Sequence, residues 1–131
     1  MTIAEVSRKY EISADTLRYY ERIGLIPPVN RTAGGIRNYT EADCSWVGFA
    51  KCMRGAGIQV EALIDYVALF QEGENSRDAR KQILIEQRDQ LQSRIQELQE
   101  TLSRLNAKIE GYENGLAQVE EKLNKKHETG K

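Results

Sequence analysis

Cysteine, histidine and proline are scarce in this sequence of 131 residues, which holds two cysteines, one histidine and two prolines. The chain shows neither a signal-peptide pattern nor an apolar run long enough to span a bilayer. We therefore expect a cytoplasmic protein with no membrane contact. A reducing cytosol would leave both thiols free rather than joined in a disulfide.

The few reactive side chains are poorly placed for catalysis or metal binding. Cys44 and Cys52 lie eight residues apart on one expected helix, which is about 12 Å of rise, whereas a disulfide needs Cα atoms within about 7 Å. His127 lies in a charged tail and is expected to be solvated. No Ser/His/Asp set, pair of buried carboxylates or phosphate-cradling loop is visible. The sequence therefore predicts neither an enzyme nor a metal or cofactor site.

Charge is nearly balanced over the whole chain, with a formal net charge of −1. The first 54 residues carry eight Lys/Arg against six Asp/Glu. This mild local surplus of positive charge is compatible with nucleic-acid binding but does not require it. The chain length fits one compact domain, or a small domain with an appendage.

Capping residues and glycines divide the first part of the chain into four predicted helices. Thr2, Ser13 and Thr40 can begin helices, because their side chains accept hydrogen bonds from free backbone N–H groups. Gly24 can end the second helix, and the Pro27-Pro28 pair then forces extended backbone. The expected helices cover approximately residues 2–10, 13–23, 40–54 and 59–72.

A β-hairpin is predicted between the second and third helices. Gly34-Gly35 supplies a turn, and the next four residues alternate with a period of two. This alternation places Arg37 and Tyr39 on one face of the hairpin and Ile36 on the other. Two short helices followed by such a hairpin are typical of a winged helix-turn-helix.

The second predicted helix exposes a polar and aromatic face. With Leu17 directed into the core, each residue steps on by about 100°. The outward residues are then Asp15, Arg18, Tyr19 and Arg22, with Tyr20 at the border. Arginine donates bidentate hydrogen bonds and tyrosine carries a hydroxyl on a stiff ring, so this face suits a DNA groove. The alternative is a solvated face with an Arg18–Asp15 or Arg22–Glu21 pair.

A second cluster bears on this choice. Arg31, Arg37 and Tyr39 belong to the predicted hairpin and come close to the second helix. Two basic and aromatic clusters that flank one helix favour a DNA interface over an ordinary solvated face.

The third and fourth predicted helices are amphipathic and contribute to the core. Their inward residues are Trp46, Phe49, Ala50 and Met53 on the third helix, and Leu63, Tyr66, Val67 and Phe70 on the fourth. Cys44 lies opposite Trp46 on the helical wheel and is expected to face water. Cys52 lies at the edge of the apolar face and is expected to be partly buried. Lys51 and Arg54 nearby would favour its thiolate.

A seven-residue apolar repeat follows a short hinge at residues 73–76, where Ser76 can cap the next helix. Its members are Leu84, Leu91, Ile95, Leu98, Leu102, Leu105, Ile109, Tyr112, Leu116, Val119 and Leu123. We expect a coiled-coil helix over residues 77–124, about 70 Å long, with a charged tail at 125–131. Gly111 and Gly115 weaken its far end. The chain has no second helix of that length, so the expected partner is another copy. A lone solvated helix would leave the whole repeat exposed.

One ordered set of residues matches a known family pattern. It consists of Thr16-Leu17-Arg18-Tyr19-Tyr20-Glu21, Gly24-Leu25, Pro28, Arg31, Gly35, Arg37 and Tyr39. The segment that carries it, residues 1–72, closely resembles the MerR family of bacterial transcription regulators. Ile36 departs from the pattern, because many members carry an aromatic residue just after the wing glycine.

The resemblance implies a mainly α fold, with a winged helix-turn-helix head followed by a coiled-coil dimerisation helix. It implies a homodimer, joined by an antiparallel coiled coil, that binds a palindrome in promoter DNA. Such regulators distort the promoter spacer so that RNA polymerase can use both promoter elements. The residues that the resemblance assigns to DNA contact are Thr16, Arg18, Tyr19, Tyr20, Arg31, Arg37 and Tyr39.

The segment FAKCMRGAGI, residues 49–58, resembles the thiol-dependent branch of this family, whose members respond to reactive aldehydes or related electrophiles. The resemblance implies that the Cys52 thiolate attacks an electrophile and that the adduct shifts the dimer to its activating shape. Metal sensors of the family carry cysteines at the start of the long helix and beyond its end, and this chain has none there. Three alternatives stay open: Cys52 as a small core residue, a regulator with a non-covalent effector or none, and a coiled-coil adaptor that binds protein.

Overall fold

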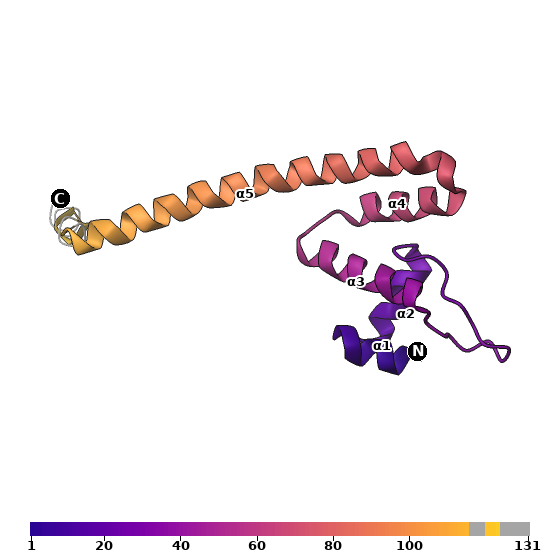
Figure 1. Ribbon diagram of the computed structural model, residues 1–131. Coiled ribbons are helices and arrows are strands. Elements are labelled where there is room, and N and C mark those ends of the chain that lie inside the picture. Colours follow the sequence, from indigo (N-terminus) through magenta and orange to yellow (C-terminus); the bar gives the residue numbers. More distant parts are fainter. Residues whose placement is uncertain (116–119, 124–131) are drawn as a thin grey trace, which may run out of the picture. The chain divides into compact units, whose positions relative to one another are not determined.

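The computed structural model describes residues 1–115 and 120–123, and it is mainly helical, as the sequence predicted (Figure 1). The chain divides into two compact units, Met1–Asp89 and a second one that begins at Gln90. The helical elements are α1 (Ile3–Tyr10), α2 (Ala14–Ile23), α3 (Glu41–Gly55), α4 (Val60–Glu72), the short 3-10 helix η1 (Glu74–Ser76) and α5 (Arg77–Glu113). None of the helices in the described ranges combines the length and apolar character that a bilayer span requires.

Side-chain caps begin the helices of the head where the sequence predicted them. At α1 the Thr2 hydroxyl accepts the N–H of Glu5 at 3.2 Å, and the Glu5 carboxylate accepts the N–H of Thr2 at 3.0 Å. Thr40 and Asp43 form the same reciprocal pair at α3. The Ser13 hydroxyl accepts the N–H of Thr16 and so begins α2. Each such cap contributes about 1 kcal/mol, which matters for helices this short.

The core of the head joins α1, α2 and α3. Val6, Leu17 and Val47, one from each of these helices, are fully buried. α1 and α2 meet through a tight turn in which Glu11 adopts a left-handed conformation, with φ of 54°. Gly24 ends α2 with φ of 81°, a conformation that glycine adopts without strain. The helix-turn-helix that the sequence predicted is therefore present.

The segment between α2 and α3 is a loop that pairs with itself at one point, so the predicted β-hairpin is not confirmed as a pair of strands. A single antiparallel bridge joins Arg31 to Arg37, and no sheet is found within residues 1–115 and 120–123. The Thr32 N–H group donates to the carbonyl of Ile36 at 2.8 Å and closes the turn. Strand pairing goes no further because Tyr39 turns inward and pairs its N–H with the carbonyl of Met1 instead.

Tyr39 was expected in a basic and aromatic cluster that faces DNA with Arg31 and Arg37, and its burial does not match that expectation. Its side chain is only 2 % exposed and belongs to the core. Ile36 lies in the turn and is 67 % exposed. The alternating pattern was real, but it reflects burial of one residue at the base of a loop.

The apolar face of α3 is wider than the helical wheel suggested. The fully buried positions are Cys44, Val47 and Ala50, whereas Trp46, Phe49 and Met53 are half-buried. Cys44 is therefore buried and not in water. The reason is that α3 packs on two sides: one side meets the core of α1 and α2, and the other meets aromatic side chains of α4.

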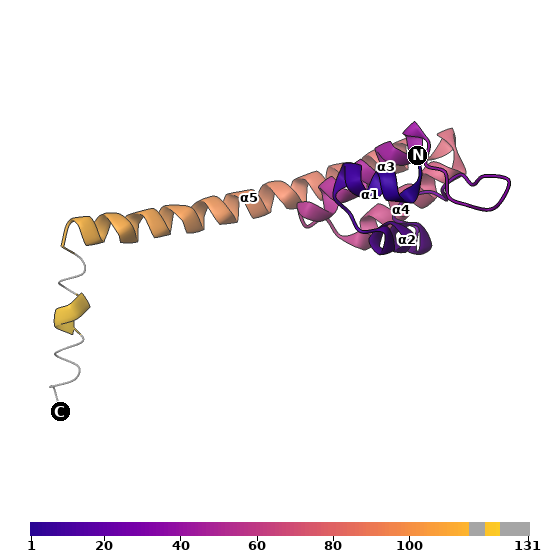
Figure 2. The ribbon, with the colours of Figure 1, turned by 90° about the horizontal axis from the view of Figure 1, so that it is seen from below.

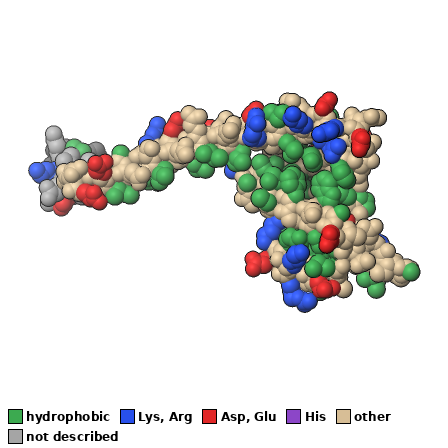
Figure 3. Space-filling view, in the orientation of Figure 1, with side chains coloured by type: hydrophobic (Ala, Val, Ile, Leu, Met, Phe, Trp, Pro, Cys, Tyr) green, Lys and Arg blue, Asp and Glu red, His purple; other side chains and the backbone are tan. Residues whose placement is uncertain are grey.

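The second side of α3 and the facing side of α4 share an aromatic cluster. Ring centroids lie 6.3 Å apart for Trp46 and Phe49, 5.9 Å for Trp46 and Tyr66, and 4.9 Å for Trp46 and Phe70. Phe70 was expected to face inward but remains 42 % exposed. Figure 3 shows hydrophobic side chains gathered on the surface over α3 and α4.

The long helix α5 has 37 residues and is about 55 Å long (Figure 2). Ser76 does not cap it in the predicted way. The Ser76 side chain is buried at the end of η1, and its hydroxyl donates to the carbonyls of Leu69 and Gly73 at 2.6 and 2.7 Å. The hydroxyl thereby fixes the turn that joins α4 to α5.

The long helix ends ten residues before the predicted seam does. α5 stops at Glu113, and Gly115 has φ of 95°. Residues 120–123 are helical again, and the Glu120 side chain contacts Lys108 and Tyr112 of α5. The predicted seam residues Leu116 and Val119, the end of the helix at residue 124, and the tail at 125–131 with His127 lie outside the described residues.

The apolar repeat of α5 is open to solvent within this chain. The exposed fractions are 46 % for Ile95, 65 % for Leu98, 56 % for Leu102, 57 % for Leu105, 57 % for Ile109 and 49 % for Tyr112. No residue of α5 is fully buried.

Candidate nucleic-acid interface

The outer face of α2 presents the side chains that the sequence predicted. Arg18 forms the ion pair with Asp15 that the alternative interpretation named, at 2.9 Å, and the side chains remain 47 % and 95 % exposed. Tyr19 is 46 % exposed, and the guanidinium of Arg22 lies 5.3 Å from the centre of its ring. The arginine therefore stacks on tyrosine and does not form the alternative pair with Glu21. An exposed ion pair this weak releases its arginine to a phosphate at little cost.

Two further predicted contact residues are engaged within the head. The Thr16 side chain accepts a hydrogen bond from the Ser13 hydroxyl at 2.8 Å, so it belongs to the cap of α2. Tyr20 is half-buried against the core. Both residues lie on the same helix as Arg18 and Tyr19, with less of their surface free.

Glu21 connects α2 to the loop between α2 and α3. Its carboxylate accepts a hydrogen bond from Nε of Arg37 at 2.7 Å and from the N–H of Val29 at 2.9 Å, and Arg31 lies 3.9 Å away. Only 13 % of the Glu21 side chain is exposed. These contacts with Glu21 bring two predicted DNA-binding arginines, Arg31 and Arg37, to the C-terminal end of α2.

The electrostatics of Glu21 fit this connecting position. Burial alone would raise the pKa of Glu21, but the hydrogen bonds from Arg37 and Val29 outweigh burial and hold the pKa below its ordinary value. Sequence reasoning did not identify Glu21 as part of the site. The available signal was a single acid lying between two basic clusters, which a helical wheel treats as an ordinary surface carboxylate.

The loop holds its other groups through the backbone and the chain terminus. Arg31 also donates to the carbonyl of Gly35 at 3.0 Å. The terminal amino group of Met1 donates to the carbonyl of Tyr39 at 2.7 Å. The Tyr39 hydroxyl is buried and has no hydrogen-bond partner among the described residues, and burial raises its pKa. An unsatisfied buried hydroxyl costs roughly 1–3 kcal/mol, so a partner supplied from outside would be favourable.

The two cysteines exchange the environments that the sequence predicted. Cys52 is exposed on α3, and Cys44 is buried with its sulfur 3.8 Å from that of Met1. The predicted neighbours of Cys52 are occupied elsewhere: Lys51 donates to the carbonyl of Tyr10, and Arg54 donates to the carbonyl of Ile58 at 2.6 Å. Cys52 is therefore the accessible thiol of the pair.

Metal ligation finds no support in the part of the chain that the structure describes. There, no three His, Cys, Asp or Glu side chains come together as a metal site. The chemistry available on the surface of the head is thus hydrogen bonding, charge and one exposed thiol.

Comparison with known proteins identifies the same kind of DNA-binding head. A sequence profile described as "MerR HTH family regulatory protein" matches residues 1–69, and one described as "MerR, DNA binding" matches residues 45–108. The HTH-type transcriptional regulator AdhR of Bacillus subtilis is 54 % identical over 91 residues. That match covers 70 % of this chain and 65 % of AdhR, so the chain spans about two thirds of the length of this relative.

Solved structures agree over most of the chain. A MerR-family transcriptional regulator from Listeria monocytogenes has a TM-score of 0.86 at 46 % identity, covering 100 % of this chain and 99 % of its own. HiNmlR, a MerR-family regulator that lacks the sensor domain, was solved bound to promoter DNA. It has a TM-score of 0.77 at 28 % identity, covering 88 % of this chain and 92 % of its own. The chain belongs to the MerR family of helix-turn-helix regulatory proteins, which are DNA-binding transcription regulators.

Proposed function

We propose that this protein is a homodimeric activator that binds a palindromic promoter site, distorts its spacer DNA and responds to a reactive aldehyde or related electrophile through Cys52. The observation that carries the DNA-binding part is the outer face of α2, where Arg18, Tyr19 and Arg22 stay accessible beside a helix-turn-helix. The DNA-bound structure of the relative HiNmlR supports the same role.

The contact set follows from the placement of these side chains. Arg18 and Tyr19 contact bases or phosphates directly, with Thr16 and Tyr20 next to them on α2. Arg31 and Arg37 reach phosphates from the loop, in competition with Glu21. Tyr39 contributes its unpartnered hydroxyl, which requires the side chains that cover it to move.

Dimerisation follows from the exposed repeat of α5. A stripe from Ile95 to Tyr112 is about half exposed at every apolar position, which water would penalise. A second copy of the same helix covers such a stripe by knobs-into-holes packing. In domain terms, residues 1–72 form the head, 73–76 the hinge and 77–124 the dimerisation helix.

Promoter distortion explains activation without contacts that recruit RNA polymerase. Two heads held at a fixed separation bind both half-sites only if the DNA between them bends or untwists. The deformation brings the two promoter elements into a spacing that RNA polymerase can use.

The sensing step is an addition reaction at sulfur. The Cys52 thiolate attacks the carbonyl carbon of an aldehyde, a carbon–sulfur bond forms, and the carbonyl oxygen takes a proton to give a hemithioacetal. Exposure of Cys52 and burial of Cys44 support this assignment. The likeness to AdhR supports the choice of branch.

Graded exposure to formaldehyde or methylglyoxal tests the sensing step. Mass spectrometry should find the adduct on Cys52 before Cys44, and promoter activity should rise with it. Cys52→Ser should abolish the response, and Cys44→Ser serves as the matched control. A Cys52→Ser protein that activates normally would contradict thiol sensing and leave a non-covalent effector, or none.

A gel shift at two salt concentrations tests the DNA-binding part against a coiled-coil adaptor. Several phosphate contacts make the affinity for a palindromic promoter fragment fall steeply as salt rises. An adaptor with a mostly apolar protein interface would show no such dependence, and no palindrome would compete.

A further inference from the structure

A pocket of about 880 Å³ lies where η1 passes into α5, within the unit Met1–Asp89. Tyr66 of α4 and Leu84 of α5 line it together with several charged residues of η1 and α5. The predicted DNA contacts and Cys52 are not among its lining residues. The pocket is therefore separate from the surface discussed so far.

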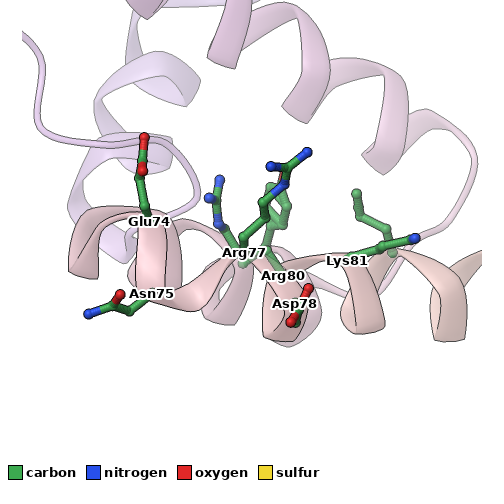
Figure 4. Close-up of a pocket in the computed structure, with 8 residues that line it drawn as sticks. Glu74, Asn75, Arg77, Asp78, Arg80 and Lys81 are labelled. Atoms are coloured by element: carbon green, nitrogen blue, oxygen red, sulfur yellow. The ribbon is translucent and has the colours of Figure 1, made fainter.

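Three cations line this pocket: Arg77, Arg80 and Lys81. Figure 4 shows the side chains of Arg77 and Arg80 extending to one side of the helix, whereas those of Asn75 and Asp78 extend to the other. None of the three cations forms an ion pair with any residue in the described ranges. The lining also contains the acids Glu74 and Asp78, so the pocket carries three positive and two negative side chains, and none of the cations is in direct contact with a described acid.

The Arg80 side chain is held in place by a ring contact, but one of its hydrogen-bond donors is unsatisfied. Its guanidinium lies 5.5 Å from the centre of the Phe70 ring, which orients the planar group. Its Nε atom is buried and has no hydrogen-bond acceptor in residues 1–115 and 120–123. Buried donors in proteins are nearly always satisfied, so an unsatisfied guanidinium N–H beside a polar pocket indicates a missing acceptor.

Glu74 is the acid that could have satisfied these donors. It lines the pocket and extends to the same side as the two arginines in Figure 4. Even so, no ion pair links Glu74 to a described residue. The acceptor that the cations lack therefore comes from outside this part of the chain.

We propose that this pocket binds a small oxyanion ligand, a carboxylate or phosphate attached to a compact apolar body. The oxyanion accepts hydrogen bonds from Arg80 and Arg77 in the fork geometry that guanidinium favours, and Lys81 adds charge. The apolar body lies against Tyr66 and Leu84, the apolar side chains of the lining. Binding here is non-covalent and requires neither DNA nor the Cys52 thiol.

The fluorescence of the protein's own tryptophan can report binding in this pocket. Trp46 is the single tryptophan of the chain, and its ring lies 5.9 Å from that of the pocket residue Tyr66. Isobutyrate and inorganic phosphate are the probes, each titrated against chloride at matched ionic strength. Both should give a saturable change in tryptophan fluorescence, and the probe with the tighter response distinguishes carboxylate from phosphate recognition.

Variants separate the pocket from general charge effects. Arg80→Gln should weaken the apparent affinity about tenfold or more, the equivalent of about 1.4 kcal/mol. Arg80→Lys, which keeps the charge but loses the fork, should weaken it to a smaller extent. Arg104→Gln makes the same chemical change elsewhere on α5 and should leave the affinity within about twofold. Thermal unfolding of each variant establishes that the head is intact.

Two results would overturn the proposal. One is a response that does not saturate or that persists unchanged in Arg80→Gln. The other is the absence of any anion response together with weaker self-association of Arg80→Gln, which would assign the cations to a contact between two copies. Because no DNA is present, failure of the DNA-binding proposal would leave this measurement unaffected.

Discussion

The unit Met1–Asp89, which contains the head, and the unit that begins at Gln90 differ in how far they bury their apolar side chains. The head buries Val6, Leu17 and Val47 completely. In the second unit, Leu98 and Leu102 of the same helical stripe are more than half exposed. The comparison teaches that the three-helix core of the head is completed within one chain, whereas the long helix leaves an apolar stripe exposed, as expected for a surface that a partner covers.

The largest expected effect comes from breaking the stripe. Leu102→Lys combined with Leu105→Lys should weaken dimerisation at least about a thousandfold, because each buried leucine contributes about 1.5–3 kcal/mol and the dimer contains both copies. Sedimentation equilibrium measures the change. Ser103→Lys places the same charge on the other side of the helix and should leave the dimer intact. Unchanged association of the double variant would mean that the stripe is not the interface.

The next effect is expected on α2 in the head. Arg18→Gln should reduce promoter affinity by about 1–3 kcal/mol per copy, since it removes a bidentate donor. Fluorescence anisotropy with a labelled palindrome checks this. Arg8→Gln, on the exposed side of α1, removes the same charge and should have a much smaller effect. Equal losses from both variants would indicate a general charge effect rather than a contact.

Glu21→Gln should destabilise the head by about 1–2 kcal/mol near neutral pH, because it weakens a hydrogen-bonded contact with Arg37. The folded pKa of Glu21 lies below the unfolded value. Its contribution to the free energy of unfolding is therefore fully present above about pH 4.3 and is lost as pH falls through the folded pKa.

Urea unfolding of the wild type and Glu21→Gln at several pH values tests this dependence. The stability difference between the two proteins should shrink below about pH 4.3. Asp15→Asn removes an exposed acid from the same helix and is the control, with little expected effect. A stability difference that stays constant with pH would show that ionisation of Glu21 does not contribute to its contacts with the arginines.

The smallest effect should come from Tyr39→Phe. The ring keeps its packing and a buried unpartnered hydroxyl is removed, so the free energy of unfolding should stay the same or rise by up to about 1 kcal/mol. Promoter affinity should nevertheless fall several-fold if the hydroxyl meets a phosphate. An unchanged affinity would restrict Tyr39 to the core.

Local signals in the sequence predicted much of the head. Thr2, Ser13 and Thr40 begin helices by side-chain hydrogen bonds to residues three positions on, and Gly24 ends one by its own conformational freedom. Such signals depend on neighbours in the chain and are readable from it. The face of α2 with Arg18 was readable for the same reason.

The misplaced features depend on contacts between distant segments. Tyr39 turns inward because its backbone pairs with Met1, 38 positions away. Cys44 is buried because α3 packs on two sides, which a single helical wheel cannot represent. Glu21 gained its role from loop residues that fold back onto α2.

The end of α5 shows a different limit. The apolar repeat continues past Gly115, yet the helix stops at Glu113 and Glu120 lies against Lys108 and Tyr112. A seven-residue pattern indicates which residues face a partner, but it does not indicate where glycine ends a helix.

Sedimentation equilibrium with and without a palindromic promoter duplex tests the central claim most directly. The account predicts a dimer of two chains in the absence of DNA and one dimer on each duplex, with both half-sites occupied together. A stable monomer at cellular concentrations that occupies the two half-sites independently would contradict it.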